Sequence, residues 1–255
     1  MIRSDDESCD AFFDGRVTIY QSRAGHRFSL DALLLAHFVT VKTGARIVDL
    51  GTGNGVIPLA LATLHPSIEV TGIELQASMV ERARRNIAHN KLQSCIKIAH
   101  GDVRSPNQIA GGGVFDAAIC NPPYRKSTSG RLSANRERQM ARHEIAGGLS
   151  EFLEAGSFLL RTNGRMAMVY GAVRSVDLLT AMRHAALEPK RLRYVHSFAR
   201  AKASLVLVEA IKAGRSGIEV LPPLIVYQRA KTYSAEAASM IAGARRLSGA
   251  LEVDP

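Results

Sequence analysis

A short apolar run that ends in three alternating glycines restricts the fold of this 255-residue chain more than any other segment. Residues 45–50 read ARIVDL, residues 51–55 read GTGNG, and residues 56–64 carry apolar side chains at helical spacing. This order predicts a strand, a tight turn and a helix. Because a strand that passes through a short turn into a helix begins a crossover between parallel strands, the segment predicts an α/β protein.

Further apolar runs of strand length recur along the chain. They cover residues 68–75, 96–102, 115–120, 164–171 and 203–211. Helical sequence separates them, as in ASMVERARRNIAHN shortly after the second strand. This alternation predicts a parallel α/β sheet that helices cover on both faces.

The composition and the position of the first predicted strand favour a single domain. A hydrophobic content of 46% is ample for one sizeable core. The 44 residues before that strand are fewer than the ~100 of a typical domain. We therefore expect one domain over residues 1–255, in which residues 1–44 form an apron on the sheet and residues 45–255 form the core.

The sequence disfavours several classes of protein. No apolar run approaches the roughly 20 residues of a membrane span, and the acidic start MIRSDDESCD differs from a signal peptide, so we expect a cytoplasmic protein without membrane contact. The three cysteines and eight histidines show no metal-ligand spacing, which predicts no metal site. The net charge of +10 fits a polyanionic partner, although such an excess also occurs in proteins that bind nothing acidic.

In a parallel sheet, ligands bind beyond the carboxyl ends of the strands, so the first predicted strand end is the first candidate site. Asp49, Gly51, Gly53 and Gly55 lie there, and the missing glycine side chains allow a ligand to approach the backbone. Val56 stands where a nicotinamide-binding fingerprint has its third glycine, which favours a smaller nucleoside ligand. A tight connection from strand to helix also requires glycine without any ligand.

The next two strand ends each present a carboxylate. Glu74 lies near the ~20-residue offset at which an acidic residue accepts hydrogen bonds from a ribose diol. Asp102 could accept a hydrogen bond from the exocyclic amine of an adenine. Alternatively, Glu74 complements a helix dipole and Asp102 caps a turn.

The fourth strand ends in the sequence NPPY, which is Asn121, Pro122, Pro123 and Tyr124. The two prolines stiffen the backbone, and Pro122 restricts Asn121 to an extended conformation. The side-chain oxygen of Asn121 and the carbonyl of Pro122 then suit the two protons of a planar amino group, at ~2.9 Å. Tyr124 could stack on the ring that carries this amine. The plain alternative is a Pro-Pro turn that only ends a strand, as at Pro222.

Together, residues 45–124 resemble the class I S-adenosylmethionine-dependent methyltransferases. The resemblance implies a Rossmann-like sheet, S-adenosylmethionine as the cofactor and N-methylation at NPPY. The residues that it assigns to the cofactor are Asp49, Gly51, Gly53, Asn54, Gly55, Glu74, Leu75, Asp102, Val103 and Asn121. Families with NPPY methylate adenine N6 in DNA or RNA, guanine N2 in ribosomal RNA, or a glutamine amide in release factors.

A strongly basic segment follows NPPY. Its predicted phosphate-binding side chains are Arg125, Lys126, Arg131, Arg136 and Arg138, interspersed with small residues. Arginines in a flexible loop beside the target pocket suit contacts with RNA phosphates. Such residues are also often only solvated.

The combination of GHRFSLDALLLAHFV at residues 25–39, NPPYRK, and SLVLVEAIKAGRSG before LPPLIVY resembles the bacterial valine-tRNA (adenine-N6)-methyltransferase family over nearly the whole chain. This implies an antiparallel strand near the C-terminus, a tRNA substrate with adenine held beside the anticodon, and closure of Ser29 and Asp31 over the methionine end of the cofactor. The segment around Asp31 can equally be an N-capped amphipathic helix.

Three competitors remain. A release-factor glutamine methyltransferase uses the same NPPY chemistry but carries a helical amino-terminal domain, for which this chain has no room. A DNA adenine methyltransferase is weakened because no segment could form a separate base-reading domain. A non-catalytic RNA-binding module would retain the fold without needing the intact cofactor and NPPY residues.

Overall fold

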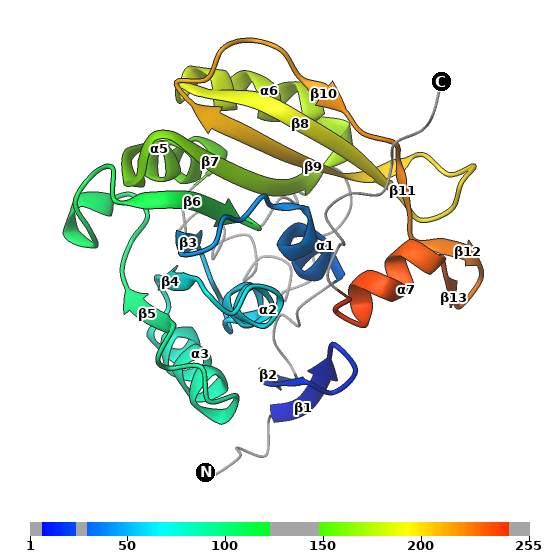
Figure 1. Cartoon of the computed structure of the whole chain (residues 1–255), viewed down its shortest axis with the longest axis horizontal. Helices are drawn as coiled ribbons and strands as arrows, with labels where there is room; N and C mark the ends of the chain where they lie inside the picture. Colours follow the sequence, from blue (N-terminus) through cyan, green and yellow to red (C-terminus); the bar gives the residue numbers. More distant parts are fainter. Residues whose placement is uncertain (1–6, 24–29, 123–147, 245–255) are drawn as a thin grey trace, which may run out of the picture.

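One sheet of nine strands forms the centre of the computed structural model, which describes residues 7–23, 30–122 and 148–244 (Figure 1). The strands lie in the order β10-β8-β9-β7-β6-β3-β4-β5, and β11 pairs with β8. In chain order they are β3 (Arg46–Leu50), β4 (Glu69–Glu74), β5 (Ile96–His100), β6 (Phe115–Cys120), β7 (Leu160–Gly171), β8 (Leu187–His196), β9 (Ala203–Lys212), β10 (Glu219–Val220) and β11 (Leu224–Ile225). Only β9 runs antiparallel to its neighbours β7 and β8. The expected mostly parallel sheet with an antiparallel strand near the C-terminus is confirmed.

Helices cover both faces of this sheet, as the sequence predicts (Figure 1). On one face lie α1 (Leu30–Phe38), α2 (Val56–Leu64), α3 (Ala77–His89) and α7 (Ala235–Ile241), and on the other α5 (Leu149–Leu159) and α6 (Ser175–His184). The side chains of β7 alternate between the two cores: Ala167 and Val169 join the first, and Met166 and Met168 the second. The sheet is therefore buried on both faces.

A hairpin of β1 (Glu7–Phe12) and β2 (Val17–Ser22) precedes this sheet without pairing with it. Asn86 on α3 and Asn90, which caps the C-terminus of α3, hold the free edge of the hairpin. The side-chain amide of Asn86 binds both backbone groups of Tyr20, and that of Asn90 binds both of Thr18, at 2.6 to 3.1 Å. These amides replace a neighbouring strand, so two strands exist where the sequence predicted none before residue 45.

The predicted strands and the helix over residues 56–64 are all present, but β8 was missed. Its sequence LEPKRLRYVH mixes four basic side chains with apolar ones. Pro189 also cannot donate a backbone hydrogen bond, and the β8–β9 ladder shifts register between Pro189 and Arg191. A two-stranded hairpin of β12 (Tyr227–Arg229) and β13 (Thr232–Tyr233) was too short to be predicted.

None of the helices in the described ranges combines the length and the apolar character that crossing a membrane requires.

Candidate active site

The carboxyl ends of β3, β4, β5 and β6 meet at one edge of the sheet. Leu50 pairs with Ile73 on one side and Cys120 on the other, and Glu74 pairs with His100. The glycine turn, Glu74, Asp102 and Asn121 therefore lie at or just beyond the ends of strands that end at about the same level. The structure brings together the four strand ends that the sequence singled out.

The glycine turn after β3 adopts a conformation that requires glycine. Gly51, Gly53 and Gly55 have φ angles of 73°, 57° and 86°, in the left-handed region. The backbone N–H groups of Gly51 and Thr52 both donate to the carbonyl of Ile73, at 2.9 Å. A Cβ atom at Gly53 would meet nothing within 4 Å, so this backbone is open to a ligand.

Glu74 has both oxygens engaged by the backbone, yet its carboxylate retains free lone pairs. It is 7% exposed and accepts hydrogen bonds from the N–H groups of Gly53, at 2.9 Å, and Gln76, at 2.8 Å. Each carboxylate oxygen can accept a second hydrogen bond. Glu74 thus both holds the glycine turn and can bind a diol beside it.

Asp49 is a buried carboxylate without a hydrogen-bond partner among the described residues. Its relative exposure is 0%, and neither its oxygens nor the nearby hydroxyl of Thr52 has a partner. Burial, with a smaller contribution from the negative charge of Glu74, raises the pKa of Asp49 to about 7. The proximity of the Thr52 hydroxyl opposes this shift, although the geometry falls short of a hydrogen bond.

Asp102 already has a partner at its strand end. Its carboxylate accepts from the side-chain Nε of Arg104 at 2.9 and 3.0 Å, from Nη2, and from the backbone N–H. The side-chain hydrogen bond from Arg104 lowers the pKa of Asp102. A ligand amine at Asp102 would therefore share this carboxylate with a guanidinium.

Asn121 follows β6 directly beside the end of β3. Its side chain is half-buried and forms no hydrogen bond with another described residue, whereas Pro122 is buried. A carboxamide that is left unpaired next to a ligand-accessible turn is available to a substrate.

Two comparisons identify the family. The description "Methyltransferase small domain" matches residues 29–185, which is more than half of the chain. This chain belongs to the methyltransferase small domain family. It is also 32% identical over 206 residues to a tRNA1(Val) (adenine(37)-N6)-methyltransferase of Porphyromonas gingivalis, covering 78% of this chain and 80% of that protein.

Solved structures agree on the fold of this methyltransferase. A predicted O-methyltransferase from Agrobacterium tumefaciens superposes with a TM-score of 0.70 at 22% identity, over 84% of this chain and 97% of that one. A geranyl diphosphate methyltransferase in complex with S-adenosylmethionine gives a TM-score of 0.51 at 16% identity, over 71% and 84%. The protein is an S-adenosylmethionine-dependent methyltransferase with the class I fold.

The described residues fit this cofactor. The cofactor carries an ammonium group, a ribose diol and an adenine, and the edge offers an unpartnered buried carboxylate, a carboxylate with free lone pairs and an open glycine backbone. Val103 is buried and Leu75 half-buried beside this edge. The side chain of Asn54 donates to Gln21 at 3.3 Å, so this predicted cofactor residue also ties the turn to the amino-terminal hairpin.

Nine predicted site residues remain, one of them within the described ranges. Asp31 lies in the first turn of α1. The residues outside the described ranges are Ser29, Pro123, Tyr124, Arg125, Lys126, Arg131, Arg136 and Arg138.

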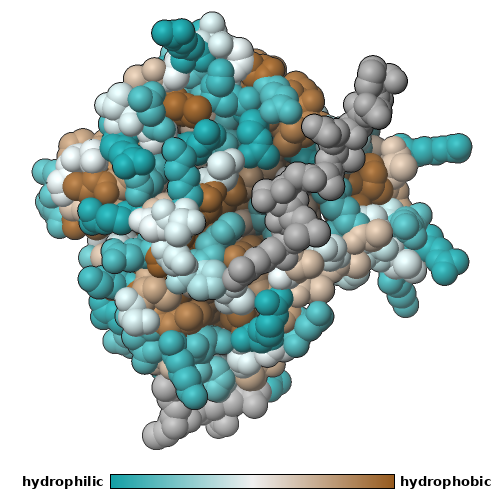
Figure 2. Space-filling view, viewed as in Figure 1, coloured by the Kyte–Doolittle hydropathy of each residue, from teal (hydrophilic) through white to brown (hydrophobic). Residues whose placement is uncertain are grey.

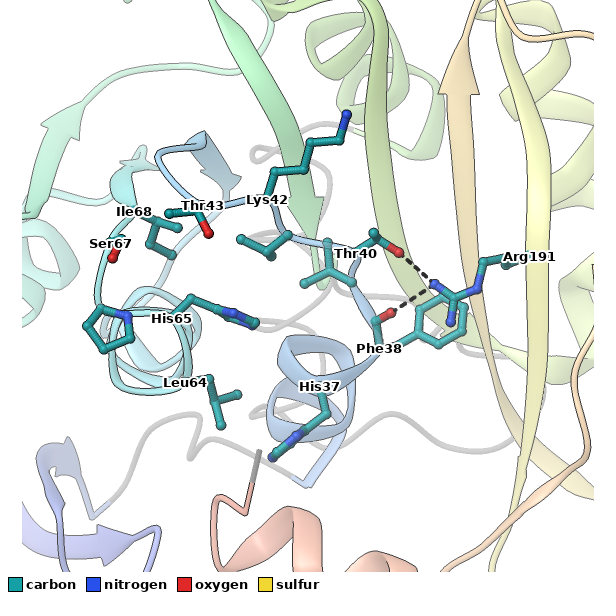
Figure 3. A pocket seen from close by; sticks show the side chains of 13 residues that line it. His37, Phe38, Thr40, Lys42, Thr43, Leu64, His65, Ser67, Ile68 and Arg191 are labelled. Atoms are coloured by element: carbon teal, nitrogen blue, oxygen red, sulfur yellow. Dashed lines mark hydrogen bonds between the residues drawn. The ribbon is translucent and has the colours of Figure 1, made fainter. Parts of the chain in front are cut away.

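The hollow in Figure 3 is separate from this edge. It has a volume of ≈ 550 Å³ and is lined by the end of α1, residues 39–43, the end of α2 and Arg191. The chain leaves this region to enter β3 and β4, so the hollow lies at the amino ends of those strands. Arg191 donates to the hydroxyl of Thr40 at 2.8 Å and to the carbonyl of Phe38. None of the predicted site residues lines it.

Sequence reasoning missed Thr52, Gln21 and Asn86. Gln21 is 1% exposed and donates to Asp10 at 2.7 Å while accepting from Asn54. Asn86 donates to the backbone carbonyl of Asn54 at 2.9 Å and so holds the glycine turn against α3. The spacing of Asn86 and Asn90 by four residues on an otherwise charged helix was the available signal.

Proposed function

We propose that this methyltransferase methylates the N6 amine of an adenine in the anticodon loop of a tRNA that resembles valine tRNA. The observation that carries the proposal is the unpaired carboxamide of Asn121 beside the glycine turn, on a chain that is similar over most of its length to a tRNA adenine-N6-methyltransferase. We also propose that the whole chain is one domain whose amino-terminal part covers the cofactor, and that it works in the cytoplasm.

Residues of the glycine turn and the neighbouring strand ends would hold the cofactor. Asp49 would face the ammonium group, Glu74 the ribose diol and Asp102 the adenine amine, with Gly51, Gly53, Gly55, Asn54, Leu75 and Val103 around them and with Ser29 and Asp31 at the methionine end. S-adenosylmethionine supplies an electrophilic methyl group, whose bond to sulfur breaks as the bond to the substrate nitrogen forms. Burial of the two carboxylates Asp49 and Glu74 keeps water from competing for these contacts.

Asn121 and Pro122 would act on the substrate amine. The Asn121 side-chain oxygen and the Pro122 carbonyl each accept one N–H of the exocyclic amine. Holding both protons directs the nitrogen lone pair toward the methyl group and stabilises the positive charge that develops on nitrogen. The nitrogen then loses one proton to solvent. Pro123 would stiffen this turn, Tyr124 would stack on the target ring, and Arg125, Lys126, Arg131, Arg136 and Arg138 would hold phosphates.

The experiment supplies labelled S-adenosylmethionine with unmodified tRNA, ribosomal RNA, duplex DNA or a release factor. The methylated product is then identified by mass spectrometry. We expect N6-methyladenosine in tRNA alone, because RNA loops present splayed bases, whereas a base in duplex DNA must first be flipped out. Label confined to guanine, to DNA or to a release-factor glutamine would overturn the proposed substrate.

A further inference from the structure

Three aromatic rings lie against one another where the turn after β8 meets the β12–β13 hairpin. The rings of Phe198 and Tyr227 are 5.7 Å apart at 37°, and those of Tyr227 and Tyr233 are 5.0 Å apart and stacked at 21°. Phe198 and Tyr233 are each 41% exposed. Neighbouring aromatic rings that are exposed to solvent often mark a binding site.

Four cations lie close to these rings in the sequence. Residues 197–203 and 227–233 contain Arg200, Lys202, Arg229 and Lys231 and no acidic residue. All four side chains are exposed, and none forms an ion pair with another described residue. Like charges without acidic neighbours repel one another, so their grouping favours a polyanionic partner.

Lys231 lies in a left-handed turn between the two short strands. Arg229 pairs with Thr232, so Lys231 lies in the two-residue tip of the hairpin, with a φ angle of 62°. Glycine or asparagine is usual in this left-handed conformation, and a lysine there is strained. This turn places an exposed cation at the tip of the hairpin.

This surface faces the same side of the sheet as the candidate active site. β9 is antiparallel to both β7 and β8, so β8 runs in the same direction as β6 and β7. The turn after His196 therefore follows the carboxyl end of its strand, as Asn121 does. β8 lies three strand spacings from β6 and extends further at its carboxyl end. The turn after β8 and Asn121 are therefore separated by on the order of 20 Å.

Figure 1 shows the β12–β13 hairpin and the turn after β8 side by side at the right of the molecule. Along the same margin, Figure 2 shows hydrophilic side chains projecting beside apolar ones. Cations around exposed rings are the combination that binds single-stranded or looped nucleic acid, since cations contact phosphates and rings stack on bases.

We propose that this aromatic–basic surface, formed by Phe198, Tyr227, Tyr233, Arg200, Lys202, Arg229 and Lys231, binds the RNA substrate away from the target nucleotide. The inference rests on the proposed tRNA methylation. The four cations contact phosphates of the stem, and the exposed ring of Tyr233 or Phe198 stacks on an unpaired base. An RNA stem with its loop extends over more than ~20 Å, so one stem-loop can reach both places.

The first test removes the four cations together by R200A, K202A, R229A and K231A. The control removes four exposed cations elsewhere by K42A, K91A, K97A and R215A, with the same change in net charge. At about 150 mM salt, we expect the first variant to bind tRNA at least tenfold more weakly than the control variant. Its log–log salt slope should be smaller by about 3, since each phosphate contact contributes roughly 0.7 to 0.9.

The second test addresses the rings. Y233A should weaken tRNA binding at least fivefold, whereas Y233F, which keeps the ring, should bind as the wild type does. For all variants, calorimetric affinity for S-adenosylmethionine and turnover at saturating tRNA should stay within twofold of wild type, because the surface contacts neither cofactor nor target amine.

The product formed by the wild-type protein distinguishes a failure of this inference from a failure of the proposed function. If its product is not N6-methyladenosine in tRNA, the proposed function fails. If the product is as proposed but the two quadruple variants bind tRNA equally, the surface does not bind RNA. The inference would also be overturned if the variant without the four surface cations kept its tRNA affinity but lost binding to anionic phospholipid vesicles. That result would assign the surface to a membrane.

Discussion

The Asp49 carboxylate lowers the stability of the folded chain, although it is proposed to bind the cofactor. Its carboxylate lies buried without a partner among the described residues, and burial raises its pKa to about 7 from an ordinary 3.8. The folded chain thus holds this proton more tightly than the unfolded chain. The contribution of Asp49 to the free energy of unfolding therefore falls as pH rises from about 4 to about 7, and the loss persists above pH 7. A cationic ligand group would offset that loss.

Replacing Asp49 by asparagine tests this conflict. A shift of about three pKa units corresponds to roughly 4 kcal/mol, which is the upper limit of the gain. We expect D49N to raise the free energy of unfolding by at least ~1 kcal/mol at pH 8 and by nothing near pH 4, while weakening S-adenosylmethionine binding at least ~tenfold.

Chemical denaturation across pH and calorimetry measure the two effects. E69Q, at an exposed position on β4, is the control that should change neither. Equal stability of D49N and wild type at every pH would show that the carboxylate is not destabilising.

At the scale of elements, α3 connects the amino-terminal hairpin to the glycine turn. Asn86 is fully buried and satisfies backbone groups of both Tyr20 and Asn54. At the edge of the hairpin, Glu7 is 2% exposed and pairs with Arg82 and Arg85 on the same helix. The hydrogen bond from Arg85 lowers the pKa of Glu7. One helix therefore anchors the hairpin at two points.

Truncation of Asn86 should loosen the hairpin and the turn together. N86A leaves three backbone groups without their partner, one of them at a buried hydrogen bond and two at part-buried ones, at a cost of about 1–3 kcal/mol for each group that water cannot reach. We expect a loss of at least ~2 kcal/mol in the free energy of unfolding by urea denaturation, together with weaker cofactor binding.

The matched control is E81A, at an exposed position on the same helix. Both quantities should stay at wild-type values in that variant. Wild-type cofactor affinity in N86A would contradict the coupling between hairpin and turn.

The elements that could be predicted are those whose pattern is local. The apolar runs of β3, β4, β5 and β6 and the helical spacing of α2 carry their own signal, and parallel order places their polar ends together. β8 was hidden by Pro189 and its basic residues. The pairing of the β1–β2 hairpin depends on Asn86 and Asn90, which are more than 60 residues away in sequence.

The candidate site also has features that could be predicted from the sequence and features that could not. Gly51, Gly53, Gly55, Glu74 and Asn121 were predictable because each lies at the carboxyl end of a strand or in the turn after it. The pairing of Asp102 with Arg104 and the lack of any described partner for Asp49 were not, since both depend on side-chain positions and burial.

At the scale of the whole molecule, one sheet edge carries the predicted chemistry and the aromatic–basic surface lies on the same side. The net charge of +10 is then partly explained by cations that face a nucleic acid. The central claim is that Asn121 accepts hydrogen bonds from the amine that is methylated, at a point fixed by the ends of β3 and β6.

The rate of methyl transfer in a single turnover tests this claim most directly. It is measured for N121A and wild type with saturating S-adenosylmethionine and tRNA, with cofactor affinity measured by calorimetry alongside. Loss of one preorganised contact to a transition state costs about 10² in rate. The account predicts a rate at least ~100-fold lower in N121A with cofactor affinity within twofold of wild type; a rate near that of wild type would contradict it.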